Sequence, residues 1–325
     1  MFPLLTQIPT PWGWIPIYAS GASLGIALLF GWYFIQHQAW AREAEARALF
    51  PLLSALALLS GFVGARLLYL LVNPRDFGNA AALLRFRQGG YYAAGALIAA
   101  LWVTRRFCRK TPQLWFAWVD RASLAFLCGL VPCGLGLWLY GSPFGSRLSP
   151  SAPSWLASLG TFPRWHLVLG PGSFAPHLLG APAWRYHVEQ KGLSPEALVS
   201  FPVHPVTLYE AAFAALAAAL LLRLRKSMRF PGEMAFWALS AYALGRLALD
   251  FLREDPERGL VLGALDISQL LALLWLLAAY WIFRRIRAQS SLFALPEGDA
   301  AEISPSQGAL DESSRMSGSS LGTEK

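Results

Sequence analysis

The stretch VHPVTLYEAAFAALAAALLL, residues 203–222, sets polar side chains at the start of a long apolar run. About 20 mostly apolar residues are needed to cross a bilayer as a helix. His204, Tyr209 and Glu210 are costly to bury at such a place, and polar groups in a span usually face a protein interior or water and mark function. The stretch therefore predicts a membrane helix with a candidate for chemistry at one end.

The composition of the whole chain agrees with a membrane protein. Of its 325 residues, 55% are hydrophobic and 14% are charged, whereas soluble domains carry about 25% charged residues. The apolar runs are long and continuous, which favours helices over the roughly 10-residue alternating strands of a membrane barrel. The net charge of +8 does not indicate nucleic acid, because Lys and Arg cluster in short loops that set membrane topology.

Seven apolar runs are predicted to cross the membrane, and the fold class is an all-α polytopic membrane protein. Basic residues follow the first, third, fifth and seventh runs, whereas residues 1–16 carry none. The excess of Lys and Arg in cytoplasmic loops then puts the N-terminus outside and the C-terminus in the cytoplasm. The predicted spans are residues 17–36, 50–72, 90–104, 114–140, 206–222, 233–251 and 264–283.

Two segments fall outside the spans. Residues 141–205 are rich in Pro, Gly, Ser and Trp, and they are predicted to form an extracytoplasmic cap with Trp155, Trp165 and Trp184 at headgroup depth. Residues 288–325 are rich in Ser, Gly and acids, which predicts a disordered cytoplasmic tail. The domain prediction is a seven-helix membrane domain over residues 1–287, with the cap inserted in it, followed by this tail.

Two constellations carry most of the candidate chemistry. A helix that begins near Pro205, where proline is tolerated, sets Tyr209 and Glu210 one turn inside; His204 and Tyr209 alternatively sit at the interface with wet tips. Arg246, Asp250 and Arg253 are spaced four and three apart, so they share a helix face. This face either binds a phosphate, whose geometry guanidinium matches, or is an internal ion-pair ladder.

A third candidate is Arg66, inside the second span in GARLLY, residues 64–69. It needs a partner or a water path, or its side chain reaches the interface. The chain has three Cys in no metal-binding pattern, so no metal site and no cofactor are predicted. Together these features suit an anionic lipid headgroup.

Several motifs resemble bacterial prolipoprotein diacylglyceryl transferases. HPVTLYEAAF (204–213) resembles that family's HPxQLYE signature, and GRLALDFLREDPERG (245–259) followed by LDISQ resembles its RFxxEFxRxD…RG and S-x-SQ pattern. GARLLY resembles its second-helix motif, IPIYASGASLGIALL its first helix, and AWRYHVEQKGL a segment before the signature in some members. The resemblance covers roughly residues 15–285, and the seven spans with the N-terminus outside agree with the family's topology.

Two positions depart from the family pattern. In GGYYAAGA (89–96), Ala94 stands where the family has a His or Tyr, and Tyr91 or Tyr92 is the candidate replacement. In GLVPCGLGLWLYGSP (129–143), Leu130 stands at the phosphate-binding Arg and Ser142 at a later Arg. No side chain in this second block replaces the Arg.

The resemblance implies transfer of the diacylglyceryl group of phosphatidylglycerol to the lipobox cysteine thiol of prolipoproteins, in the bacterial inner membrane. The partners are phosphatidylglycerol, prolipoprotein signal peptides and the bilayer. It implies that Arg246 and Arg253 bind phosphate with support from Arg66. His204 or Glu210 is the base that such chemistry needs. The remaining implied site residues are Tyr18 and Tyr209, which position the headgroup, and Tyr92, which binds substrate.

Two other functions are weighed against this one. A relative that has lost transfer, through Leu130 and Ala94, would bind a phospholipid or a lipoprotein precursor or act on another lipid. A small-molecule transporter is the third hypothesis, from a different class. Transporters often show paired repeats with broken helices, and the sequence has no such repeat.

Overall fold

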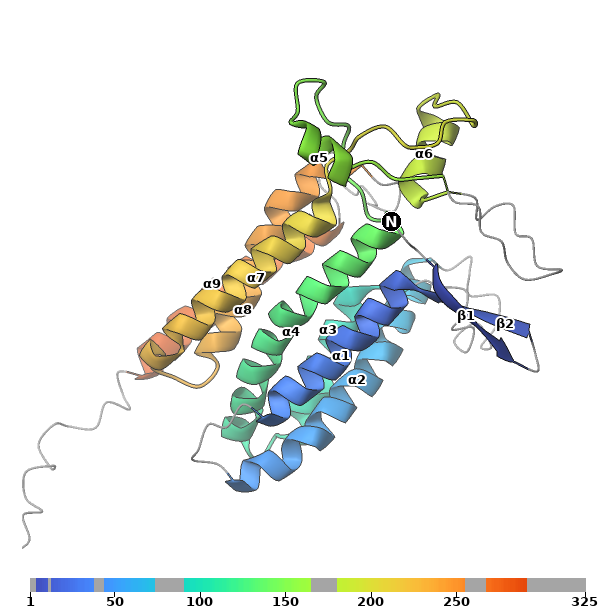
Figure 1. Ribbon diagram of the computed structural model, residues 1–325. Helices are drawn as coiled ribbons and strands as arrows, with labels where there is room; N and C mark the ends of the chain where they lie inside the picture. Colours follow the sequence, from blue (N-terminus) through green and yellow to red (C-terminus); the bar gives the residue numbers. More distant parts are fainter. Residues whose placement is uncertain are drawn as a thin grey trace, which may run out of the picture. The chain divides into compact units, whose positions relative to one another are not determined.

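The computed structural model describes residues 4–10, 13–37, 44–73, 91–164, 180–254 and 267–290 (Figure 1). It divides into Met1–Trp281, to which all contacts below belong, and Ile282–Lys325. The predicted tail lies almost entirely outside the described residues. The elements are β1 (Leu4–Thr10), β2 (Gly13–Tyr18), α1 (Ala19–His37), α2 (Ala44–Val72), α3 (Ala93–Phe107), α4 (Pro112–Tyr140), α5 (Ser154–Leu159), α6 (Pro182–Gln190), α7 (Val206–Leu224), η5 (Arg225–Ser227), α8 (Glu233–Leu249), η6 (Asp250–Leu252) and α9 (Ile267–Ser290).

All seven predicted spans coincide with helices, which confirms a helical multi-pass membrane protein. Five of them, α1, α2, α4, α7 and α8, are long and apolar enough to cross a membrane. Helix α3 has only 15 residues, and α9 is not among these five. The count of seven spans and their orientation stay predictions.

Beside the helices, the described residues include one antiparallel hairpin near the N-terminus. Strands β1 and β2 pair with Ile8 opposite Ile15, and β2 runs directly into α1. Aromatic and β-branched residues favour strands, and Pro9 and Pro16 oppose a helix. The first helix therefore begins at Ala19, two residues later than predicted.

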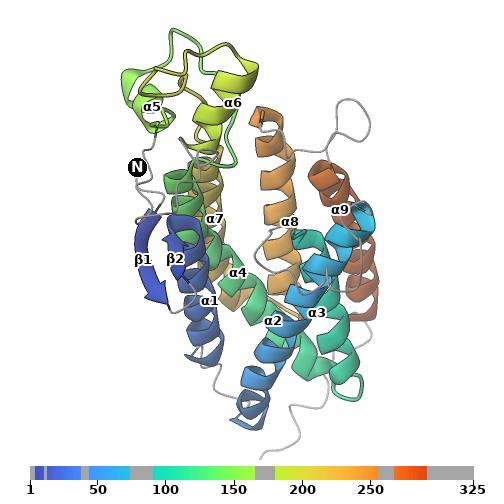
Figure 2. The ribbon, with the colours of Figure 1, turned by 90° about the vertical axis from the view of Figure 1, so that its right-hand side faces the viewer.

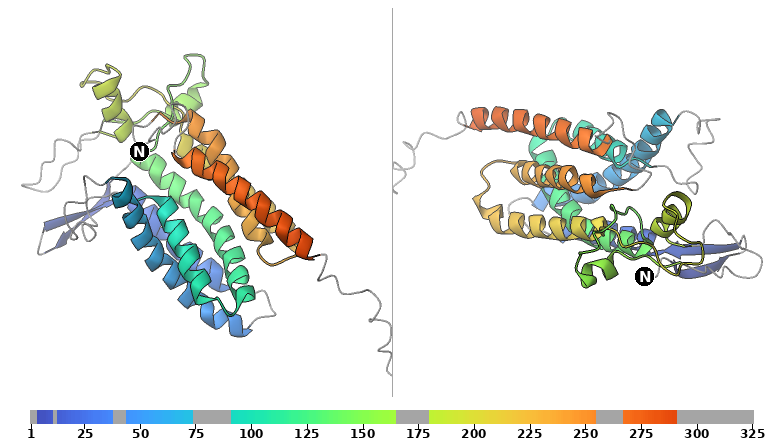
Figure 3. Two further views of the ribbon diagram at one scale, coloured as in Figure 1. Left: turned by 180° about the vertical axis from the view of Figure 1, so that it is seen from behind. Right: turned by 90° about the horizontal axis from the view of Figure 1, so that it is seen from above.

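Helix α4 is the centre of the packing, since it contacts α1, α7 and α8 (Figure 3). Helices α2 and α3 form a second close pair (Figure 2). Small residues allow these approaches. A Cβ on Gly64 of α2 would lie 2.5 Å from the carbonyl oxygen of Gly95 in α3, and one on Gly134 of α4 would lie 2.6 Å from that of Thr207 in α7.

A partly buried carboxylate holds the start of α8 against α4. Asp120 Oδ2 accepts a hydrogen bond from the Gly232 N–H at 2.8 Å, and Oδ1 accepts one from the Ala235 N–H at 2.8 Å. The first turn of a helix has N–H groups without intrahelical acceptors and favours negative charge. Asp120 therefore satisfies this helix end from a neighbouring helix, and it sets the position of α8, which carries Arg246 at its other end.

The described parts of the cap, residues 141–164 and 180–205, have a hydrophobic core of their own. Phe144, Phe162 and Val203 are nearly fully buried in it. Trp184 is also buried and donates its indole N–H to the Ala197 carbonyl oxygen at 2.9 Å. Trp184 therefore fills this core, and its depth relative to a membrane stays a prediction. Trp155 is 64% exposed, and Trp165 lies outside the described residues.

Substituting Gly136 in α4 tests the contact between α1 and α4. A Cβ there would overlap the Ser23 hydroxyl and lie 2.8 Å from the Ala19 carbonyl oxygen. We expect Gly136→Val to lower the free energy of unfolding by about 1–3 kcal/mol, because overpacking forces the helices apart. Thermal unfolding in detergent measures the change.

The matched control is Gly25→Ala in α1, where an added Cβ meets nothing within 4 Å. This variant should unfold at or slightly above the wild-type temperature, since Ala favours helix more than Gly does. Equal unfolding temperatures for Gly136→Val and wild type would contradict the close packing of α1 on α4.

Candidate functional site

Helix α7 begins where the sequence predicts. Pro205 is its N-cap residue and Val206 its first residue, so His204 lies just before the helix. The His204 Nδ1 atom is 3.3 Å from the Tyr209 hydroxyl. The first turn of α7 therefore brings this pair together and places Glu210 one residue further along the helix.

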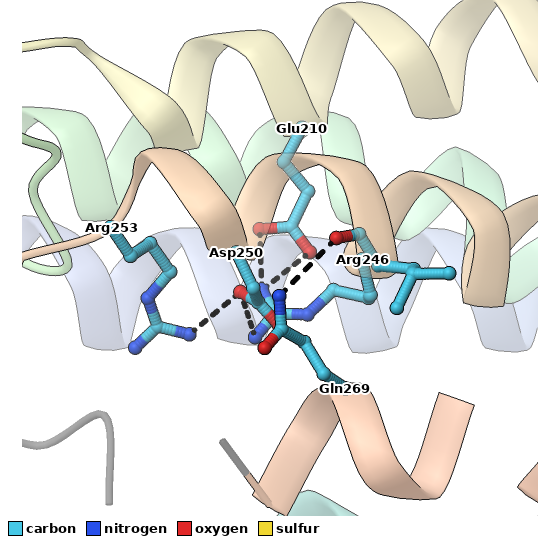
Figure 4. Close-up of polar contacts among 6 residues, drawn as sticks. Glu210, Arg246, Asp250, Arg253 and Gln269 are labelled. Atoms are coloured by element: carbon cyan, nitrogen blue, oxygen red, sulfur yellow. Dashed lines mark hydrogen bonds and ion pairs between the residues drawn. The ribbon is translucent and has the colours of Figure 1, made fainter. Parts of the chain in front are cut away.

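The end of α8 carries two arginines on one carboxylate. Asp250 Oδ1 lies 3.0 Å from Arg246 Nη2 and 3.1 Å from Arg253 Nη1 (Figure 4). Asp250 is fully buried, whereas the two arginine side chains keep 16% and 12% of their surface exposed. The prediction that these residues share one face is confirmed, and the arginines are within reach of a further ligand.

Glu210 joins this cluster from α7. Both of its carboxylate oxygens lie 3.4 Å from Arg246 Nη1, and 15% of its side-chain surface is exposed. Sequence spacing relates residues only within one helix, so it gave no sign of a pair between residues 36 positions apart. The contact links the two candidate constellations into one arginine–carboxylate network.

Gln269 lies in the LDISQ motif at the start of α9. Its side chain is fully buried and donates a hydrogen bond from Nε2 to the Leu247 carbonyl oxygen of α8 at 3.4 Å (Figure 4). The contact ties α9 to the turn of α8 that carries Arg246. Asp266, the predicted N-cap of this helix, lies outside the described residues.

Arg66 of α2 is buried among tyrosines. Its guanidinium carbon lies 5.6 Å from the ring centres of both Tyr69 and Tyr91, within the range of cation–π attraction. The Tyr92 ring lies 5.7 Å from the Tyr69 ring. Arg66 is only 5% exposed, so its side chain does not reach out to an interface.

The remaining predicted site residue, Tyr18, ends β2. Its ring makes an edge contact with the ring of Tyr140 at 6.0 Å. Tyr140 is the last residue of α4, so this contact joins the hairpin to the point where the cap begins.

Leu130, which the motif comparison sets at the position of the family's phosphate-binding Arg, has apolar surroundings. It packs against the buried cluster where α4, α7 and α8 meet, which includes Leu127, Ala218 and Ala238. Ala94 lies in the first turn of α3, two residues after Tyr92. The arginines of the network are therefore Arg246 and Arg253, and the correspondence of Leu130 to the family Arg stays a prediction.

A segment of the cap holds both halves of the network in place, which sequence reasoning missed. Gly145 N–H donates to the His204 carbonyl oxygen at 3.0 Å, His204 N–H to that of Ser146 at 2.9 Å, and Ser146 N–H to that of Leu252 at 2.7 Å. A Cβ on Gly145 would lie 2.6 Å from the His204 Cβ. The backbone before α7 and the backbone after α8 therefore bond to the same short segment.

Helix α6 buttresses this segment through a buried histidine. His187 is 2% exposed, and its ring centre lies 5.3 Å from that of Phe201 and 6.1 Å from that of Phe144. Burial lowers the pKa of His187 from its usual 6.5 to about 4, with further lowering by Lys191 and Arg147 and an opposing effect of Glu254. At neutral pH this side chain is an uncharged part of the cap core.

These features define a membrane-embedded helical protein with an arginine–carboxylate site at the adjoining ends of two helices. Within the described ranges, no three His, Cys, Asp or Glu side chains gather where they could hold a metal ion. The family described as prolipoprotein diacylglyceryl transferase matches residues 7–285. The chain belongs to this family.

Curated relatives agree with the family match over most of the chain. A protein of Erwinia tasmaniensis is 25% identical over 261 residues, which cover 76% of this chain and 79% of the relative. One of Clostridium botulinum strain 657 is 24% identical over 273 residues, 83% of this chain and 92% of the relative. A protein of Sodalis glossinidius is 25% identical over 258 residues, which cover 76% of this chain and 80% of the relative. All three are named phosphatidylglycerol–prolipoprotein diacylglyceryl transferase.

The burial of His187 makes the stability of the cap depend on pH. Its pKa is lower in the folded state, so the unfolded state binds more protons between pH 6.5 and 4. The stabilisation is therefore complete above pH 6.5 and is lost as the pH falls toward 4. We expect a loss of about 1–2 kcal/mol between pH 7 and pH 5, measured as earlier thermal unfolding or faster amide exchange in α6.

The control is His187→Phe, which keeps an aromatic ring in the cap core but cannot take a proton. Its stability should change less between pH 7 and pH 5 than that of wild type. The same pH dependence in both proteins would show that another group is responsible.

Proposed function

We propose that this protein transfers the diacylglyceryl group of phosphatidylglycerol to the lipobox cysteine thiol of a prolipoprotein and releases glycerol phosphate. Membership of the family and the names of the relatives support this reaction. The observation that carries the proposal is the pair of partly exposed arginines on buried Asp250, beside Glu210. This arrangement offers cations for a phosphate and a carboxylate for a proton.

The arginines act on the leaving group. As the thiol sulfur attacks the lipid's glycerol carbon, negative charge builds on the departing phosphate. Arg246 and Arg253 are held by Asp250 before substrate arrives, so they can stabilise that charge without first being ordered. Guanidinium donors suit phosphate oxygens, and charge-assisted hydrogen bonds are stronger than neutral ones. Buried Arg66 supports the substrate from α2.

The acidic and aromatic residues act on the nucleophile and the headgroup. A thiol attacks as its thiolate, so a nearby base speeds the reaction. Glu210 and His204 both lie at the start of α7 and are the candidates for this base. Tyr209 orients His204 through their 3.3 Å contact. Tyr18 and Tyr92 position the lipid headgroup and the substrate.

The proposed location is the bacterial inner membrane, with the N-terminus and the cap outside and the C-terminus in the cytoplasm. The excess of Lys and Arg after alternate spans supports this orientation. Under this orientation the site lies at the extracytoplasmic end of α7, and the backbone bonds between the cap and His204 support that proposal. A prolipoprotein held by its signal peptide would bring its lipobox cysteine to that side.

A second candidate function is binding of a phospholipid or a lipoprotein precursor without transfer of the diacylglyceryl group. The observation that favours it is the apolar packing of Leu130 where the family has a phosphate-binding Arg. Losing a buried charge-assisted contact typically costs about 2–5 kcal/mol, which is several powers of ten in rate. Ala94, at a position where the family has His or Tyr, also favours this second function.

A transfer assay with an Arg246 variant tests the proposed function. Purified protein in phosphatidylglycerol liposomes is given a lipobox peptide, and mass spectrometry detects diacylglyceryl on its cysteine. We expect Arg246→Ala to slow transfer at least about a hundredfold, because the departing phosphate loses a positioned donor. The matched control is Arg223→Ala in the last turn of α7, where the arginine is exposed, and it should transfer at the wild-type rate.

Two outcomes would contradict the proposal. Full activity of Arg246→Ala would show that the site assignment is wrong. If the wild-type protein gives no mass shift while an active homologue does so in parallel, the result would support the second candidate function, binding without transfer. Leu130→Arg and Ala94→His would then show whether these two positions explain the loss.

A further inference from the structure

Arg246 has two carboxylate partners of unequal strength. Asp250 is fully buried, lies 3.0 Å from Arg246 and also holds Arg253. Glu210 keeps 15% of its side-chain surface exposed, and both of its oxygens are 3.4 Å from the same Arg246 nitrogen. Charge-assisted hydrogen bonds are usually about 2.7–2.9 Å long. Asp250 is therefore the firm partner and Glu210 the weak one.

The anionic headgroup of the lipid would compete with carboxylates for the arginines. Two carboxylates, Glu210 and Asp250, contact Arg246, and Asp250 also contacts Arg253. A phosphate diester carries a negative charge of its own and repels a carboxylate beside it where water is scarce. Entry of the phosphate at Arg246 is therefore favoured when one carboxylate moves away, and contact lengths and burial identify Glu210 as the one that moves.

We propose that the lipid phosphate replaces Glu210 on Arg246, and that the released Glu210 carboxylate is the base that activates the cysteine thiol. Asp250 stays in place and acts as a positioning residue for both arginines. This inference rests on the proposed function. It ties the two substrates together, because the base becomes available only when the phospholipid occupies the site.

The proton and electron balance of the step is complete. The Glu210 carboxylate takes the thiol proton, and the thiolate sulfur forms a bond to the glycerol CH₂ of the diacylglyceryl group. The bond from that carbon to the phosphate oxygen breaks, and its electrons leave on the phosphate. The proton on Glu210 then passes to the phosphate group, so the products are the thioether and glycerol phosphate, and Glu210 returns to Arg246.

His204 is the competing base, and its contacts differ. Its Nδ1 atom faces the Tyr209 hydroxyl at 3.3 Å, and its backbone is held by Gly145 and Ser146 of the cap. A phosphate on Arg246 would not displace it from either contact. Arrival of the lipid at Arg246 would therefore release Glu210, which contacts that arginine. It would not release His204, which is held by Tyr209 and by the cap.

The experiment separates binding of the lipid from the chemical step. Transfer to a lipobox peptide is measured with vesicles of increasing phosphatidylglycerol content, giving kcat and an apparent KM for the lipid. We expect Glu210→Gln to lower kcat at least about a hundredfold while KM stays equal or falls, because the amide no longer competes with phosphate. Asp250→Asn should raise KM and lower kcat, because both arginines lose their fixed partner.

A pH profile gives a readout that a purely structural role would not move. A free cysteine thiol ionises by itself near pH 8.5. The deficit of Glu210→Gln should therefore shrink about tenfold for each pH unit between 6.5 and 8.5, whereas that of Asp250→Asn should not. The matched carboxylate-to-amide control is Glu189→Gln on the exposed surface of α6, which should behave as wild type. Thermal unfolding confirms that each variant is folded.

Three results would overturn the inference. The first is a rise in KM for Glu210→Gln with unchanged kcat, which would make Glu210 a binding residue. The second is a deficit that does not shrink with pH. The third is a larger loss of kcat, with recovery at high pH, in His204→Gln than in Glu210→Gln, which would make His204 the base.

Failure of the proposed function is distinguishable from failure of this inference. If wild type transfers nothing, exchange is tested by binding of glycerol phosphate alone to the purified protein. Tighter binding to Glu210→Gln than to wild type would support exchange at Arg246 in a protein without transfer. Equal or weaker binding would refute exchange.

Discussion

The contact of two arginines with the buried carboxylate of Asp250 is the interaction on which the rest of the site depends. A carboxylate with no exposed surface is costly in an apolar bundle, and two guanidinium groups compensate its charge. Its bonds fix Arg246 and Arg253 relative to each other, while the weaker contact with Glu210 brings α7 to the same place. Removal of either arginine would take away one of the cations that compensate the buried carboxylate, so the same contacts build the site and hold these helix ends together.

The rest of the structure holds that arrangement at both ends of α8. At its start, Asp120 of α4 accepts two backbone N–H groups. At its end, Gln269 of α9 bonds to the Leu247 carbonyl oxygen, and the cap segment at Gly145 and Ser146 bonds to the chain on either side of the site. These contacts are hydrogen bonds, which have direction. Apolar packing alone, as between α4 and α7, leaves helices freer to slide or rotate.

Much of the fold could be predicted from the sequence, because membrane spans are a matter of local composition. Each of the seven runs overlaps a helix within the described residues, and α7 begins after Pro205 as expected. The face shared by Arg246, Asp250 and Arg253 follows from helical spacing. The hairpin over residues 4–18 was not predicted, because strand preference depends on pairing with a partner strand more than on local composition. The burial of Trp184 in the core of the cap was not predicted, because aromatic residues favour both an interface and a core, and only tertiary packing distinguishes the two.

The sequence by itself determined the class of protein, the helix positions and the residue types of the site, since each depends on neighbours within one helix or one run. The tertiary structure decided which of these residues meet. It paired Glu210 with Arg246 across two helices, enclosed Arg66 among tyrosines, and set Leu130 in an apolar cluster. These outcomes depend on how helices far apart in the chain rotate and pack against each other, which local spacing does not specify.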